Sequence, residues 1–226
     1  MKLKISIILA IFLISTNIYS QEAQTVYKIP FASKGNEIEL EVANDSELNL
    51  TDVAVTAIEK PEWIKLNSKQ EIIAELNSNK KRKVVFSFDV DKEANVMEEQ
   101  ILKFQITGNN QVWNKEIAIS VLPPTKFELN QNYPNPFNPS TTISYTIPTL
   151  ETLHATSPQL TTVRLTIFDI LGREVATLVN KEQQPGFYKV NWSAGNYASG
   201  MYIYQIIAKY KNGERKIARK KLMLMK

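Results

Sequence analysis

The stretch Glu37-Ile38-Glu39-Leu40-Glu41-Val42 alternates charged and apolar residues without a break. Successive side chains of an extended strand point to opposite faces, so this pattern predicts a strand with Ile38, Leu40 and Val42 on one face of a sheet. The same alternation recurs in three later runs, at residues 84–90, 102–106 and 117–121. Short alternating strands separated by turn residues indicate an antiparallel β-sandwich of the immunoglobulin-like type for residues 21–122.

The second half of the chain repeats this period, since residues 163–167 and 188–192 also alternate apolar and polar positions. Between the halves stand Pro123 and Pro124. Consecutive prolines cannot continue a β-ladder, and they stiffen an extended connection. We therefore expect an all-β protein with two Ig-like sandwiches in tandem, in which a proline-rich linker at 123–126 joins domains at 21–122 and 127–226.

Two glycine-containing segments predict hairpins in the second domain. Gly172 follows Leu171 in a turn that needs positive φ, and glycine adopts that conformation without a steric penalty. Lys211-Asn212-Gly213-Glu214 predicts a type I′ turn, which requires positive φ at both central residues. Between the first two strands of this domain, residues 148–161 form a longer segment that we expect to be an exposed loop.

The N-terminus has the layout of a secretory signal peptide. Lys2 and Lys4 precede an apolar run over residues 5–14, which is too short to span a bilayer. A small residue is wanted before the cleavage site, so we predict cleavage between Ser20 and Gln21, with residues 1–20 removed. No later run is apolar and long enough for a transmembrane helix, and the mature protein is expected to be soluble.

Composition narrows the possible functions. The 226 residues include no Cys and one His, which argues against thiolate nucleophiles, disulfide frameworks and cysteine zinc sites. We expect no catalytic residue, metal or cofactor. Residues 123–226 carry 13 Lys and Arg against 6 Asp and Glu, and this charge is concentrated in residues 209–226. We interpret those basic residues as a solvated edge hairpin rather than a nucleic-acid site.

The start of the second domain is dense in proline and asparagine: Asn132-Tyr133-Pro134-Asn135-Pro136-Phe137-Asn138-Pro139. The prolines fix φ and push the residues before them away from helix, so a rigid, irregular loop is predicted. Asn135 and Asn138 are suited to local Asx turns, and Tyr133 and Phe137 are expected to insert into the core.

Five ordered segments together give this half a specific resemblance: residues 132–139, 168–175, 185–192, 198–204 and 221–226. Residues 127–226 resemble the type A C-terminal sorting domain of the type IX secretion system. The resemblance implies an Ig-like sandwich that the outer-membrane secretion machinery reads after periplasmic folding. It also implies removal by a sortase-like protease, anchoring of the cargo to cell-surface lipopolysaccharide, and a location at the cell surface or outside the cell. The residues that it implies for recognition are Tyr133, Pro134, Asn135, Pro136, Phe137, Asn138, Pro139, Gly172, Gly186, Gly200, Lys221 and Lys226.

Residues 21–122 more loosely resemble a bacterial Ig-like domain that is often appended to exported enzymes. We expect a non-catalytic binding or structural role for it. One alternative is a carbohydrate-binding module with Trp63 and Trp113 as stacking platforms, although a tryptophan in such a domain more often fills the core. A glycosidase that uses carboxylates alone is a further alternative, but a sandwich of this size offers little room for a cleft.

Overall fold

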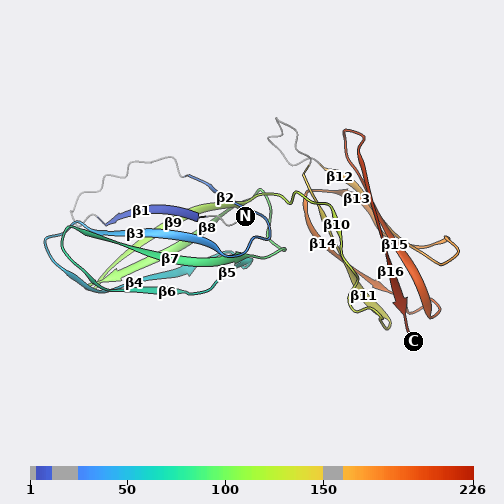
Figure 1. The fold of residues 1–226 in the computed structure, drawn as a ribbon, viewed down its shortest axis with the longest axis horizontal. Helices are drawn as coiled ribbons and strands as arrows, with labels where there is room; N and C mark the ends of the chain where they lie inside the picture. Colours follow the sequence, from blue (N-terminus) through green and yellow to red (C-terminus); the bar gives the residue numbers. More distant parts are fainter. Residues whose placement is uncertain (1–3, 12–24, 150–159) are drawn as a thin grey trace. The chain divides into compact units, whose positions relative to one another are not determined.

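The computed structural model of the protein describes residues 4–11, 25–149 and 160–226. Throughout these ranges the regular structure is β-strand, which confirms the all-β prediction. The chain divides into two compact units, Met1–Leu122 and Pro123–Lys226 (Figure 1). The predicted cleavage site at Ser20 and Gln21, and most of the predicted loop at 148–161, lie outside the described residues.

The first unit consists of two facing sheets, with strand orders β1-β3-β7-β5 and β2-β9-β8-β4-β6. Its strands are β1 (Lys4–Ile11), β2 (Tyr27–Ile29), β3 (Asn36–Asn44), β4 (Leu50–Glu59), β5 (Ile64–Leu66), β6 (Gln70–Leu76), β7 (Lys80–Val90), β8 (Glu99–Gly108) and β9 (Gln111–Val121). Most neighbours are antiparallel, but β1 pairs with β3 and β2 pairs with β9 in parallel.

Alternation places the core of this unit where the sequence predicts it. Ile38, Leu40 and Val42 of β3 are buried against inward residues of the facing sheet such as Phe104, whose ring centroid lies 4.9 Å from that of Phe86. The β8–β9 hairpin turns through Asn109 and Asn110, both at positive φ, which is type I′ geometry. Asparagine tolerates this conformation better than most residues, which suits Asn109 and Asn110 to the turn.

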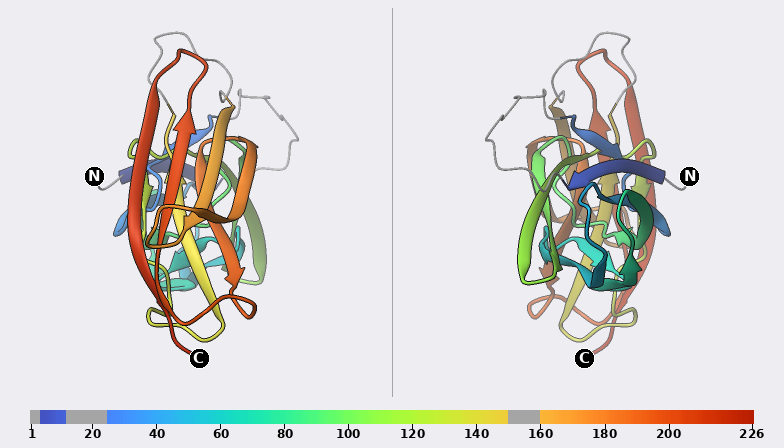
Figure 2. Two further views of the ribbon diagram at one scale, coloured as in Figure 1. Left: turned by 90° about the vertical axis from the view of Figure 1, so that its right-hand side faces the viewer. Right: turned by 90° about the vertical axis from the view of Figure 1, so that its left-hand side faces the viewer.

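The second unit also has two sheets, with orders β10-β11-β14 and β13-β12-β15-β16. Its strands are β10 (Glu128–Leu129), β11 (Ser140–Ile147), β12 (Thr161–Phe168), β13 (Glu174–Gln183), β14 (Gly186–Ser193), β15 (Gly200–Lys209) and β16 (Arg215–Leu224). The last strand, β16, forms an edge of its sheet (red in Figure 2). Ile143, Leu165, Ile206 and Trp192 contribute to a core that is separate from that of the first unit.

The hairpin between β15 and β16 is present, but the type I′ prediction for its turn is wrong. Gly213 has φ of 87° whereas Asn212 does not have positive φ, and the Gly213 amide donates to the Tyr210 carbonyl at 3.0 Å. This is a type I turn followed by a left-handed glycine, which bulges the hairpin by one residue. The turn at Gly172, with φ of 79°, has the same arrangement with Asp169 as its first residue.

Candidate functional site

The proline-rich loop of the second unit is fastened to the sandwich through Tyr204 of β15. The Tyr204 hydroxyl donates to the Asn130 carbonyl at 2.7 Å and accepts the Asn132 amide at 3.0 Å. Burial raises the pKa of this phenol to about 12, so the hydroxyl keeps its proton and both hydrogen bonds over the ordinary pH range. Tyr204 therefore fixes the path of the chain as it enters the loop.

A second buried contact shapes the loop from inside. The Asn132 side-chain amide donates to the Pro134 carbonyl at 3.0 Å and to Thr141 Oγ1 at 2.9 Å, and Thr141 Oγ1 donates to the same Pro134 carbonyl at 2.8 Å. Asn132 and Thr141 are both buried. Proline cannot donate a backbone hydrogen bond, so a segment rich in proline needs side chains of this kind to hold its carbonyl groups.

The same loop is bonded to the last strand. Phe137 exchanges backbone hydrogen bonds with the chain at residues 223–225, in which its amide donates to the Met223 carbonyl and its carbonyl accepts the Met225 amide, both at 3.0 Å. Asn135 Oδ1 accepts the Met223 amide at 2.9 Å. Gln131 Nε2 donates to the Lys221 carbonyl at 2.7 Å. We name residues 130–139 together with 221–226 the loop–β16 junction.

Two expectations for the loop side chains need correction. Phe137 is 2% exposed and packs on Trp192, with ring centroids 5.5 Å apart, but Tyr133 is 81% exposed and does not insert into the core. The Tyr133 backbone pairs with Thr142, which directs its side chain to solvent. Asn135 does not bond its own turn, because its side chain reaches the backbone of β16 instead.

The structure brings together only some of the predicted recognition residues. Gly200 pairs with Leu224 at the end of β16, beside the loop–β16 junction, and the Gly172 turn lies at the same end of this sheet. Gly186 pairs with Ile147, at the opposite end of β11 from the loop. Lys226 Nζ donates to the Gly195 carbonyl at 2.8 Å, which fixes the chain terminus near β14.

Sequence reasoning missed three contributors to this junction: Gln131, Thr141 and Tyr204. Each binds backbone carbonyl or amide groups of the loop or of β16. One signal was available for Tyr204, because alternation places it on the inward face and a buried phenol needs a hydrogen-bond partner. Nothing in the sequence pattern points to the other two.

The first unit has a pocket of about 460 Å³ at one end of the sandwich, lined by Pro61, Glu62, Trp63, Asp91, Glu93, Asn95 and Gln100. Trp63 is half-buried and also packs against the core. Trp113 is likewise half-buried and packs against the core, but it is not among the residues that line the pocket.

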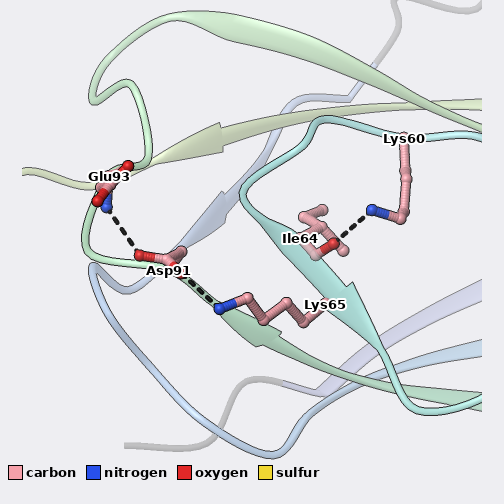
Figure 3. A network of polar contacts seen from close by, with 5 residues as sticks. All are labelled: Lys60, Ile64, Lys65, Asp91 and Glu93. Carbon is pink, nitrogen blue, oxygen red and sulfur yellow. Dashed lines mark hydrogen bonds and ion pairs between the residues drawn. The ribbon is translucent and has the colours of Figure 1, made fainter.

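Asp91 organises one wall of this pocket (Figure 3). Its carboxylate accepts Lys65 Nζ at 2.6 Å and the Glu93 amide at 3.2 Å, while the Asp91 amide donates to the Trp63 carbonyl at 2.9 Å. The lysine hydrogen bond and the backbone amides hold the pKa of Asp91 below its usual range. Asp91 is therefore a charged acceptor at neutral pH and is not suited to donate a proton as a general acid.

No cluster of three or more potential metal-ligating side chains is found within the described ranges. In the same ranges there is no helix with the length and hydrophobicity to cross a membrane.

Comparison with known families assigns the second unit. Residues 131–220 match the family model described as the secretion system C-terminal sorting domain. The second unit carries a C-terminal sorting domain. This confirms the resemblance drawn from the five segments, and it means that the chain bears an export signal for type IX secretion. The sorting domain takes the protein across the outer membrane to the cell surface or the extracellular space.

The match to the sorting domain begins at residue 131, within the loop–β16 junction, and covers the loop and most of β16.

No match was found among curated proteins. Many solved structures are similar at low identity, and three of them serve as examples. Latent PorU from Porphyromonas gingivalis is 12% identical over 91% of this chain and 19% of its own, with a TM-score of 0.35. The calcium-binding domain CBD12 of CALX1.1 is 9% identical over 85% of this chain and 78% of its own, with a TM-score of 0.35.

A tetra-tandem repeat of a large adhesion protein is 18% identical over 80% of this chain and 43% of its own, with a TM-score of 0.32. The chain thus spans about a fifth of the PorU chain and less than half of the solved tandem-repeat chain. At TM-scores of this size, none of the three assigns an activity or a partner to the chain that carries this sorting domain.

Proposed function

We propose that the loop–β16 junction is the surface at which the secretion machinery recognises the sorting domain, and that the first unit is the cargo. The supporting observation is the set of hydrogen bonds between residues 131–137 and 221–225. These two segments stand at opposite ends of the domain sequence and meet only when every strand between them is in place. A receptor that binds both at once would select domains that have finished folding.

We further propose that the signal peptide at 1–20 is removed on entry to the periplasm and that a sortase-like protease cuts before the sorting domain. Leu122, Thr125 and Lys126 are exposed, whereas Pro124 between them is buried and its carbonyl accepts the Thr149 amide, so we expect the cut on either side of Pro124. Anchoring to lipopolysaccharide, implied by the sequence resemblance, stays a prediction.

Cell fractionation in a bacterium that carries type IX secretion tests this proposal. Deletion of residues 221–226 removes one side of the junction, and the protein is expected to stay in the periplasm. Asn135→Ala, which removes only the bond to the Met223 amide, is expected to lower the surface fraction several-fold. Asn180→Ala changes an exposed asparagine on β13, the opposite edge strand of the same sheet, and serves as the control. Surface delivery that survives the deletion would contradict the proposal.

For the first unit we propose a non-catalytic binding role, and the pocket at Trp63 favours a saccharide as the ligand. An indole face can pack against the C–H face of a sugar ring, while Glu62, Asn95 and Gln100 offer acceptors and donors for its hydroxyl groups. The pocket volume is within the ordinary range for small ligands, roughly 300–1,000 Å³.

Binding to a panel of bacterial surface glycans tests this role, with Trp63 fluorescence as a second measurement. Trp63→Ala is expected to abolish binding, and the control Trp113→Ala, outside the pocket, is expected to leave it unchanged. Release of reducing ends from a bound glycan would contradict the non-catalytic role. Equal loss of binding in both variants would contradict the choice of pocket.

A further inference from the structure

The signal-peptide segment occupies the edge of a sheet in the full chain. Residues Lys4–Ile11 form β1 and pair in parallel with β3 over eight residue pairs, from Lys4 with Glu37 to Ile11 with Asn44 (Figure 1). In this sheet β3 lies between β1 and β7, so β1 is the element that covers the outer edge of β3. Removal of residues 1–20 therefore removes an entire strand of the first unit.

The edge that is left is long and regular, and its remaining protection is the charge of Glu37, Glu39 and Glu41. β3 is nine residues long, contains no proline, and keeps an unbroken register with β7. The other edge strands of the first unit are shorter, with three residues in β2, three in β5 and seven in β6. A long, regular edge presents a row of unpaired amide and carbonyl groups, and native proteins normally shorten, bend or cover such edges.

The mature chain cannot refill this position with its own N-terminus. After cleavage at Ser20, six residues precede β2, fewer than the eight that β1 pairs with β3. These six lead directly into Tyr27–Ile29, which belongs to the other sheet, where it pairs with β9. The new N-terminus is therefore too short to supply all eight pairs that β1 makes with β3.

We propose that, once the signal peptide is removed, the β3 edge binds an extended segment of a different protein, which adds a parallel strand in the place of β1. This inference rests on the proposed removal of residues 1–20. Backbone pairing would supply most of the affinity, as in other cases of strand addition, and side chains would supply selectivity. Ile38, Leu40 and Val42 are fully buried with β1 in place, so the segment needs apolar residues at alternate positions.

Charge defines a second requirement on the partner. Glu39 Oε2 lies 3.1 Å from Lys4 Nζ, and Glu39 Oε1 lies 2.8 Å from Lys83 Nζ. Lys83 stays after cleavage whereas Lys4 leaves, and Glu37 and Glu41 lie two residues to either side on the same strand. Lys81 also stays, 3.1 Å from Glu41, so this face of β3 carries three Glu beside two Lys of β7. A segment with a Lys or Arg within reach of Glu39 would replace the charge of Lys4 and is preferred.

Fluorescence polarisation with a labelled peptide of the sequence of residues 4–11 tests the proposal. A chain that begins at Gln21 is expected to bind it saturably, and the full chain from Met1, whose edge is occupied, is expected to bind at least about tenfold more weakly. Glu39→Lys in the Gln21 chain should weaken binding about fivefold, and a Lys4→Glu peptide should restore it. Thermal unfolding confirms that the variant protein is folded.

Edge pairing is separated from general hydrophobic adhesion by methylating alternate amides of the peptide. Amides of a parallel strand point alternately toward and away from the neighbouring strand, so one methylated series should abolish binding and the other should retain it. Equal behaviour of the two series would overturn the proposal, as would self-association of the Gln21 chain through this edge without peptide.

Mass spectrometry of the exported protein tests the premise separately. If residue 21 is the N-terminus and no peptide binds, the inference fails while the export function stands.

Discussion

The two units share one architecture, and each combines exposed ion pairs with buried polar contacts: the first unit also buries Asn44, whose amide donates to the Leu76 carbonyl, and the second also pairs Arg164 with Glu174. In the first unit, cross-strand ion pairs such as Lys81 with Glu41 and Lys103 with Glu116 lie on the sheet surfaces. In the second, Tyr204 and Asn132 form buried hydrogen bonds that fasten a loop. Exposed ion pairs contribute little to stability, whereas a buried polar group that loses its partner is costly. In either unit, a buried polar contact should therefore matter more for stability than an exposed ion pair.

Removal of the Phe137 ring is expected to have the largest effect and to be confined to the second unit. Phe137 is 2% exposed and fills space against Trp192, so Phe137→Ala leaves a cavity at the junction of the loop and β16. We expect the free energy of unfolding of the second unit to fall by about 3 kcal/mol. Calorimetry that resolves two transitions would show the transition of the second unit moving to lower temperature while that of the first unit stays in place.

Tyr133→Ala is the matched control, an aromatic residue in the same loop that is 81% exposed. Its effect on stability should stay within about 0.5 kcal/mol. If Tyr133→Ala lowers surface delivery without changing stability, the exposed ring contacts the secretion machinery. Equal destabilisation by the two substitutions would contradict the assignment of Phe137 alone to the core.

Tyr204→Phe is expected to have an intermediate effect. The substitution keeps the ring but removes the hydroxyl that bonds the Asn130 carbonyl and the Asn132 amide, and it leaves both groups without this partner. We expect a loss of about 1–3 kcal/mol in the second unit, together with faster hydrogen exchange at Asn132. Tyr202→Phe removes a bond to the nearby Ala198 carbonyl and should leave exchange at Asn132 unchanged.

Alternation of apolar and polar residues predicted β3, β7, β8, β9, β12 and β14 and their inward side chains, because burial of one sheet face is a local, periodic property. It did not identify β1, whose apolar run is typical of a signal peptide, or the short strands β2, β5 and β10. It could not decide which way Tyr133 and Phe137 point, since an irregular loop has no period. It also could not find the partner of Asn135, which lies 88 residues away on β16. The turn at Gly213 shows a third limit: Asn-Gly fits two turn types, and the strand register decides between them.

The smallest expected effect lies in the first unit and depends on pH. The Lys65 hydrogen bond and backbone amides lower the pKa of Asp91 in the folded state, so the charged carboxylate favours folding. This contribution is complete above the unfolded pKa, roughly 3.9, and is lost as pH falls through the lower folded value. Asp91→Asn should therefore cost up to about 1 kcal/mol at pH 7, and the cost should shrink as the pH falls below the unfolded pKa.

Lys65→Met removes the same pair from the other side and should reproduce most of this pH dependence. The two changes together should cost less than their sum, because they share one interaction. Urea unfolding of the first unit from pH 2 to pH 7 provides the measurement. A pH-independent loss would mean that Asp91 acts through the shape of its turn with Glu93 and not through its charge. In that event Asp91 would stabilise the first unit as Tyr204 stabilises the second, through the geometry of its hydrogen bonds and not through charge.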